Sequence, residues 1–352
     1  HITDEFPVII RGTRPVGMGN AFIAMQGSDS NAQFYNPASI NDFDSEISYE
    51  VSAPAAEFDA GIFPMISDLL KLRDDLHNAT GTQQKIDIFK EFAEKDTGRY
   101  NHLSSSMVLF QARNKNFSAS MIADNHSVIS LRDQAFPNFE LKTTTTFGPV
   151  VGGAIGLLND DLQLGTNIKF LYRMGIEKQI IIGDILVNSI SDLIGFGAWD
   201  KGFGVGMDLG LKYKLPFAKE SLNPTIGATI QDLGNTYFTD DAPPIPMSVS
   251  LGAGIFPKIG NVGFSILADF RELNRQKNFL TKFHFGIEAK FPKTLKTIFS
   301  LRAGCNQGYP AVGASASWGL VTMNLAFYGE EAGEYDYSKA DYRGAVGFDF
   351  IF

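Results

Sequence analysis

Long runs in which every second residue is apolar dominate this 352-residue sequence. The clearest run lies between Phe203 and Leu215, and two others lie at 162–173 and 262–271. Successive side chains of a β-strand point to opposite faces, so this alternation predicts strands with one apolar face. The runs reach roughly the 9 to 11 residues that a tilted strand needs to cross a membrane, whereas strands of soluble β-sandwiches are usually shorter. The pattern therefore favours membrane-spanning strands.

The composition agrees with a transmembrane barrel. The sequence holds 35 Gly and 30 Phe, which is high for a soluble enzyme, and its mean hydropathy of −0.04 and lack of a long apolar run argue against a helical membrane protein. A barrel accounts for both, because only every second residue of a strand must face lipid. The net charge of −9 disfavours a nucleic-acid partner. The single cysteine excludes an intrachain disulfide framework, and without a Cys/His cluster we expect no metal and no cofactor.

The alternating runs predict an all-β chain, a transmembrane antiparallel β-barrel of about fourteen strands, and an even number is usual for single-chain bacterial barrels. The connections alternate in length, as expected for short periplasmic turns and long outer loops. The predicted strands lie near 46–57, 104–113, 116–128, 139–158, 162–178, 202–215, 222–232, 246–256, 261–272, 281–291, 296–305, 310–318, 319–329 and 341–352.

One region has helical periodicity instead. Between Phe63 and Lys95, apolar residues recur at helical spacing among charged ones, which predicts two short amphipathic helices. They would form either a lid or interaction surface at the barrel mouth, or a hairpin that packs its apolar stripe on the plug described next.

The N-terminal segment Pro7–Ile40 matches no strand pattern. It is rich in glycine, holds a short helical candidate around Asn20–Met25, and contains an Asn36-Pro37-Ala38 turn. We interpret it as a plug. The chain then divides into a plug at 1–45 and a barrel at 46–352, with a helical insertion at about 60–98.

The last strand, from Asp341 to Phe352, ends on an aromatic residue. A terminal phenylalanine with aromatic residues at alternate positions before it resembles the C-terminal signal that barrel assembly machinery reads in outer-membrane barrels. The plain alternative is an apolar closing strand of a soluble β-protein. The residues of the predicted signal are Tyr342, Phe348, Phe350 and Phe352.

Two segments resemble a known family. Arg11–Ile40 looks like the N-terminus of the FadL-like outer-membrane barrels, which transport long-chain fatty acids and hydrocarbons, and of related TraF-like and porin-like proteins. The matching parts are Gly17–Ala21, Gly27–Ser30 and Tyr35–Ala38. Arg302–Glu331 is similar to the last strands of the TraF-like group. The two segments bracket nearly the whole chain.

This resemblance implies a protein of the Gram-negative outer membrane, present as the mature form after removal of a signal peptide. It implies a hydrophobic ligand, such as a fatty acid, and a plug that gates its passage. The residues that the resemblance and the local pattern assign to the plug and its gating are Gly17, Gly19, Tyr35, Asn36, Pro37 and Ala38.

No catalytic constellation is evident, so we expect no enzymatic activity. Among the five histidines only His284 alternates inward beside possible polar partners, and a lone lumenal histidine is more often a hydrogen-bonded wall residue than a general base.

Charged residues at inward positions of the strands carry both signs in comparable numbers. This balance favours a salt-bridged wall or a plugged interior over a strongly ion-selective pore. The predicted lumen-facing residues are Lys169, Arg173, Asp208, Lys212, Asp269, Arg271, Glu288, Arg302, Arg343 and Asp349.

Two functions of different classes remain open. The first is uptake of hydrophobic or lipidic compounds. The second is a non-transporting, homo-oligomeric barrel that traps or organises membrane lipid. Four glycines in one strand favour the second slightly, because small residues allow a neighbouring subunit or lipid chain to approach; they are Gly148, Gly152, Gly153 and Gly156. An outer-membrane phospholipase is a third, less favoured reading.

Overall fold

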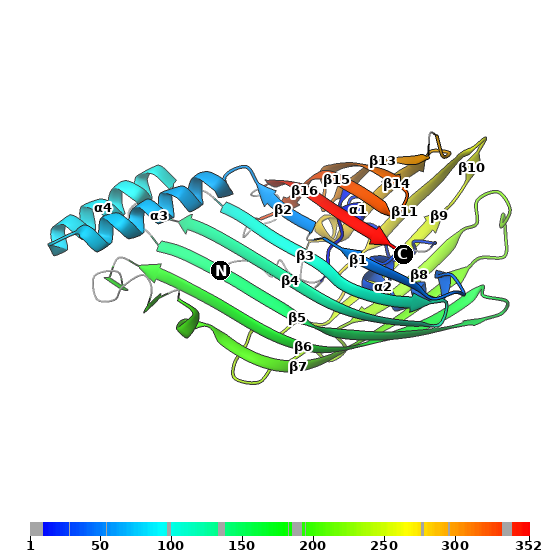
Figure 1. Cartoon of the computed structure of the whole chain (residues 1–352), viewed down its shortest axis with the longest axis horizontal. Coiled ribbons are helices and arrows are strands. Elements are labelled where there is room, and N and C mark those ends of the chain that lie inside the picture. Colours follow the sequence, from blue (N-terminus) through cyan, green and yellow to red (C-terminus); the bar gives the residue numbers. More distant parts are fainter. Residues whose placement is uncertain are drawn as a thin grey trace.

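The computed structural model describes residues 10–27, 29–53, 55–96, 100–132, 138–181, 183–184, 192–193, 195–275, 278–294, 296–332 and 340–352. Their strands form one antiparallel sheet that closes on itself, because β1 and β2 each pair with both β3 and β16 (Figure 1). β1 and β2 are two halves of the first strand, and β10 is a two-residue piece paired with β11. The described wall therefore has the 14 strands that the sequence predicts.

The strands differ in length around the barrel. Those from β3 to β7 have 15 to 20 residues, whereas β8 has 7 and β9 and β12 have 8 each. The wall is therefore taller along β3 to β7 than elsewhere, and the extra height lies at the end of the barrel where α3 and α4 are attached (Figure 1). The strands are β1 (Ser48–Ser52), β2 (Ala55–Asp59), β3 (Tyr100–Asn114), β4 (Phe117–Arg132), β5 (Asn138–Leu157), β6 (Leu162–Ile181), β7 (Asp200–Lys214), β8 (Thr225–Gln231), β9 (Ser248–Ile255), β10 (Lys258–Ile259), β11 (Val262–Phe270), β12 (Phe283–Lys290), β13 (Thr297–Asn306), β14 (Tyr309–Trp318), β15 (Val321–Glu331) and β16 (Ala340–Ile351).

The alternation of the sequence separates a lipid-facing surface from an inner one. On β7, Phe203 and Val205 are 69% and 63% exposed, whereas Asp208 and Lys212 are buried inside the barrel. The same period holds along β4, β5 and β6, whose residue pairing runs without a shift of register. A one-residue slip would turn every charged inner side chain towards lipid, so the burial of these charges fixes the register.

The described part of the plug, residues 10–27 and 29–43, lies inside the barrel and is almost fully buried. It contains the short helices α1 (Thr13–Gly17) and α2 (Ala32–Tyr35) and a 3₁₀ turn at Pro37–Asp42. The predicted helix around 20–25 is wrong. Asn20 adopts a φ of 64°, and the N–H groups of the residues after Ala21 bond to a wall carboxylate instead of helix carbonyls.

Two helices, α3 (Ile62–Asn78) and α4 (Thr82–Asp96), form a hairpin after β2. Their buried stripe does not pack on the plug, so that expectation is wrong. It contacts Phe139 and Leu141 of β5, together with Ile129, Leu131, Ile176 and Ile180 of the adjoining strands. By alternation, Phe139 and Leu141 share a face with the exposed Phe147. The hairpin therefore covers the outer face of the tall side of the wall. Within the described residues, no helix is both long enough and apolar enough to span a membrane.

Met207 lies near the middle of the outward face of β7, and we expect Met207→Arg to reduce barrel assembly. An arginine facing lipid at mid-depth costs roughly 2 to 4 kcal/mol. The folded fraction is measured by heat-modifiability on a gel, with Met207→Leu as the matched control. Equal folding of the two variants would contradict the assignment of this face to lipid.

Candidate functional site

The candidate site is the interior of the barrel, where wall side chains bind the main chain of the plug. Asp269 of β11 accepts hydrogen bonds from the N–H groups of Phe22 and Ile23 at 2.5 and 3.0 Å. Lys212 of β7 donates to the carbonyl oxygen of Met25 at 2.6 Å. Buried backbone groups must be paired, and an irregular segment cannot pair its own as a helix does. Inward polar residues of the wall supply those partners.

Further inward residues do the same at other points of the plug. The Nδ1 atom of His284 lies 3.0 Å from the carbonyl oxygen of Gly19, and Arg271 donates to the carbonyl oxygen of Asn20. Arg271 also lies over the ring of Tyr35, at 5.1 Å from its centroid. His284 is thus placed as a hydrogen-bonded wall residue against the plug.

The Asn36-Pro37-Ala38 turn rests directly on the wall. The side-chain amide of Asn36 donates to the carbonyl oxygens of Ile23 and Leu211, and its oxygen accepts from the N–H of Ala38. The contact is close because the wall has glycine there: a Cβ on Gly210 would lie 2.1 Å from the Asn36 side-chain oxygen. The predicted gating turn is therefore held at a fixed place.

Gly17 and Gly19 play the corresponding part on the plug. Gly17 approaches the backbone of Gly313, and a Cβ on Gly19 would lie 2.5 Å from the carbonyl oxygen of Cys305. Gly19 also has a φ of 61°, a conformation that glycine adopts without strain.

Ion pairs join plug and wall as well. Arg14 lies 2.5 Å from Asp29 of the plug and 2.5 Å from Glu288, and Glu288 also binds Arg302. Arg11 pairs with Glu330 at 2.8 Å. Glu330 in turn binds the buried Arg343 at 2.7 Å, and Arg343 binds Asp341. The sequence reasoning missed the plug side of these pairs, although charged residues in a segment rich in glycine and small residues were a usable signal.

Asp42 makes the third such connection. Its carboxylate lies 2.5 Å from the Nζ of Lys212, with Lys214 and Gln163 nearby. Burial raises the pKa of Asp42, but Lys212, Lys214 and Gln163 lower it, and the net pKa lies below the usual range. The remaining predicted lumen residues pair within the wall or its loops: Lys169 lies 2.7 Å from both Asp208 and Asp232.

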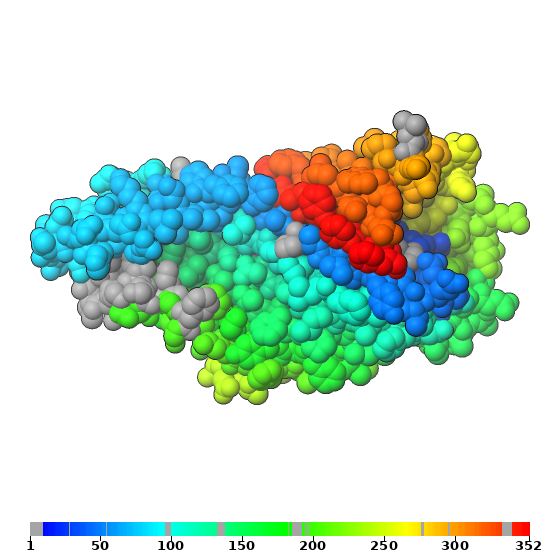
Figure 2. Space-filling view, in the orientation of Figure 1, coloured from blue at the N-terminus to red at the C-terminus, as the bar shows by residue number. Residues whose placement is uncertain are grey.

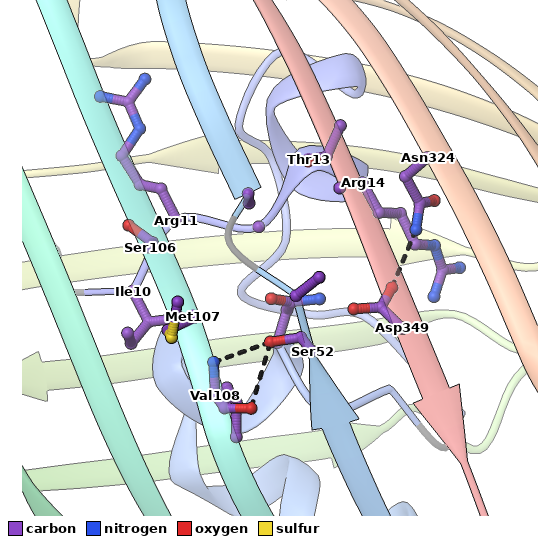
Figure 3. Close-up of a pocket in the computed structure, with 15 residues that line it drawn as sticks. Ile10, Arg11, Thr13, Arg14, Ser52, Ser106, Met107, Val108, Asn324 and Asp349 are labelled. Atoms are coloured by element: carbon purple, nitrogen blue, oxygen red, sulfur yellow. Dashed lines mark hydrogen bonds between the residues drawn. The ribbon is translucent and has the colours of Figure 1, made fainter.

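A small polar pocket lies where the first strand is interrupted, between β1 and β2 (Figure 3). The hydroxyl of Ser52 there accepts from the N–H of Val108 and donates to its carbonyl oxygen, replacing a missing strand contact. The pocket holds about 20 Å³, which is room for one water. A polar chamber of about 180 Å³ adjoins it through Arg14, Asn31, Asn324 and Asp349. Predicted lumen residue Asp349 accepts from Asn324 at 2.9 Å.

An apolar crevice of about 580 Å³ lies on the outer wall at a second irregularity. The pairing of β5 with β6 lapses between Phe147 and Val150, at Gly148 and Pro149. Proline has no N–H to donate to a ladder. The crevice is lined by residues of β4 to β7 and of the segment after β8, among them Phe147, Phe170, Tyr172, Phe203, Tyr237 and Phe238.

Inside the barrel, an apolar cluster lies behind this crevice. It joins Ile10 and Phe34 of the plug to wall residues Val108, Ile122, Val150 and Leu171, with Ile245 and Phe238 of the loop. Leu171 and Phe238 belong to both the crevice and the cluster. Arg173 lies over the Phe238 ring at 5.5 Å and donates to Thr146 and to the carbonyl oxygen of Pro243. No pattern in the sequence indicated this junction.

The glycine argument for an oligomeric lipid-organising barrel is wrong. Gly152 and Gly156 face inward, where an added Cβ would meet Ile40 and Asn41 of the plug. A Cβ on Gly148 would meet the carbonyl oxygen of Phe170 within the wall. Only Gly153 is on the outward face of these four, so they form no groove for a neighbour. The glycines make room for the plug and the adjoining strand.

The C-terminal aromatic residues lie along the closing strand. Tyr342 and Phe352 are exposed on the outside, and Phe348 and Phe350 are half-buried. Phe352 exchanges two backbone hydrogen bonds with Tyr49 of β1, which closes the barrel at this end. Recognition of these residues by the assembly machinery stays a prediction. Among the described residues, no group of three or more His, Cys, Asp or Glu could hold a metal ion.

The geometry defines a plugged transmembrane β-barrel, and solved structures share this fold. The CymD monoaromatic hydrocarbon channel matches with a TM-score of 0.51 and 11% identity over 98% of each chain. A TodX monoaromatic hydrocarbon channel mutant lacking S2 and S3 matches with a TM-score of 0.56 and 11% identity over 97% of this chain and 98% of that one. The toluene transporter TodX of Pseudomonas putida matches with a TM-score of 0.50 and 10% identity over 99% of each chain.

No protein-family model matches the sequence, and no curated protein does. The similarity to the channels therefore establishes the fold, and it confirms the barrel expected from the FadL-like resemblance.

We expect Gly210→Ala to displace the plug without unfolding the barrel, because its Cβ would fall 2.1 Å from the Asn36 side chain. Conductance in planar bilayers should rise and the plug should become accessible to protease. Gly153→Ala is the matched control, since its Cβ meets no atom closer than 3.7 Å. Unchanged conductance in both would mean that the turn adapts to the extra methyl group.

The Asp42 pairs predict that the plug loosens in acid. A carboxyl whose pKa is lowered in the folded state stabilises that state above its unfolded pKa of about 4, and the contribution is lost as pH falls through the lower folded pKa. Conductance should therefore rise below about pH 4. Asp42→Asn should raise conductance at neutral pH and shrink the acid step. An acid step of the same size in the variant would assign the effect to other carboxyls.

Proposed function

We propose that this chain is an outer-membrane channel that admits hydrophobic compounds into a Gram-negative cell. The fold that it shares with hydrocarbon channels supports this proposal. The main supporting observation is the junction at Gly148 and Pro149, where apolar side chains line both sides of the wall. Leu171 and Phe238 belong both to the outer crevice and to the inner cluster. A hydrophobic compound could pass there between lipid and lumen without crossing the charged interior.

The junction is a weak point of the wall for a physical reason. Every residue of β5 from Asn138 to Leu157 pairs with a residue of β6, except Gly148 and Pro149. An open strand edge is not tolerated in lipid, because its N–H and C=O groups lack partners. Proline has no N–H group to leave without a partner, and glycine has no side chain to pack. A lapse of pairing therefore costs less free energy at these two residues than at an ordinary strand pair.

The other break, between β1 and β2, is less suited to such compounds. Its pocket is polar and holds about 20 Å³, against about 580 Å³ for the apolar crevice. Burying an apolar molecule is favourable roughly in proportion to the apolar area removed from water. A hydrophobic compound would therefore partition into the crevice at β5, and the β1–β2 pocket would admit only water.

The plug takes part through its apolar side. Ile10 and Phe34 lie in the inner cluster, while other parts of the plug are held to the wall by the Asp269, Lys212 and Arg14 contacts. In this proposal the plug stays anchored, and passage needs only local displacement at the cluster. The proposal includes no catalytic step.

A disulfide across the junction tests the function. In a Cys305→Ala background, Pro149→Cys with Phe170→Cys should form a staple that holds β5 against β6. Uptake of radiolabelled toluene by proteoliposomes should fall severalfold on oxidation and recover on reduction. The matched control is Val151→Cys with Ile168→Cys, an exposed and regularly paired position two residues along the same strands.

The outcomes separate the two parts of the proposal. Uptake that falls equally in both stapled pairs would mean that wall stiffness, not the junction, matters. Uptake that is absent in the reduced, unsubstituted protein would contradict a channel for such compounds altogether.

A further inference from the structure

The first turns of α3 carry an exposed apolar stripe that no part of the described chain covers. Phe63, Ile66 and Leu70 are 60%, 37% and 50% exposed. Their spacing of three and four residues places them on one side of the helix. They are distinct from the buried stripe of α3, formed by Ile62, Met65, Leu72 and Leu76, which packs on the wall and α4.

The stripe changes character along the helix. Arg73 lies three residues after Leu70, and His77 lies four residues after Arg73, so both are on the same side of the helix, and both are exposed. Arg73 pairs with Asp74 at the surface. The apolar part is therefore confined to the end of α3 nearest the barrel, and the far end is polar.

The stripe begins at the rim of the lipid-facing surface. The Phe63 ring packs edge-on against Phe58 of β2, with centroids 5.5 Å apart. Asp59, the next residue of β2, pairs with Arg343 of β16, so the exposed Tyr342 lies at the level where the hairpin starts. Tyr342 is stacked on Phe327 at 5.9 Å. Girdles of exposed aromatic side chains flank the lipid-facing band of outer-membrane barrels at both boundaries with water.

We propose that the first half of α3 is a membrane-contact surface, with Phe63, Ile66 and Leu70 in the interface of the outer leaflet. From Phe63 to Leu70 the helix advances about 10 Å along its axis. An amphipathic helix that lies on a membrane buries its apolar side roughly 5 to 10 Å into this boundary. The hairpin, which extends from the barrel as an arm in Figure 2, then rests on lipid at its base.

Lipid fits this stripe better than a protein partner. A specific protein interface buries about 800 Å² on each side, whereas this is a single row of three side chains. The row is also continuous with the barrel surface that lipid must cover. This inference does not depend on the proposed transport function.

Site-directed spin labelling tests it. In a Cys305→Ala background, nitroxide labels are placed by Phe63→Cys, Ile66→Cys and Pro64→Cys. Pro64 is exposed and lies one residue from Phe63 and two from Ile66, spacings that place it on another side of α3, so it is the matched control. The proteins are reconstituted in phosphatidylcholine vesicles, and folding is checked by heat-modifiability. The collision ratio of oxygen to a water-soluble nickel complex should be severalfold higher at 63 and 66 than at 64.

Two results would overturn the proposal. Equal ratios at the three positions would place the stripe in water. Labels at 63 and 66 that are shielded from both reagents, in detergent as well as in vesicles, together with a dimer in solution, would show that a second copy covers it. As a second measurement, amide exchange of α3 in vesicles should be severalfold faster after Phe63→Ser, Ile66→Ser and Leu70→Ser are combined, and an unchanged rate would also contradict lipid contact.

Discussion

The structure depends on one requirement: inside a membrane, every backbone N–H and C=O group needs a partner that is not water. Strands meet it by closing into a barrel, and here β1 and β2 complete the ring between β16 and β3. An irregular plug cannot meet it alone. The wall therefore turns polar side chains inward, and Asp269, Lys212 and His284 bind plug main-chain groups where no strand or helix partner exists.

This use of the wall explains the balanced interior charge. Each buried ion would be costly if left alone, and removing one partner of a buried pair leaves an uncompensated charge. Arg14, Glu288 and Arg302 form one such group, and Arg11, Glu330 and Arg343 another, each joining a plug arginine to the wall. The interior is thus occupied by a fixed polar contact surface. A hydrophobic compound has its apolar surroundings elsewhere, at the junction of β5 and β6.

The two wall irregularities show how the same barrel can keep polar and apolar regions apart. At the first strand, Ser52 substitutes for a ladder contact and the pocket stays polar. At β5, Gly148 and Pro149 pair with β4 but not with β6, and aromatic and aliphatic side chains fill the space on both sides of the wall. The hairpin of α3 and α4 covers the taller wall beyond this point from outside, so the outer face of the extended strands is buried there.

The sequence by itself determined the barrel, because a strand buries alternate residues and that period is visible in runs such as 203–215 without any knowledge of partners. It also determined which charges face inward, since period and register are linked. Only the tertiary structure decided what those charges meet: Asp42 and Lys212 are 170 residues apart in sequence, and no local pattern pairs them. The same holds for the junction at Gly148 and for the outer position of the hairpin. Both arise from contacts between distant segments. An apolar stripe in a sequence predicts that one side of a helix is buried, but it does not predict which surface that side packs against.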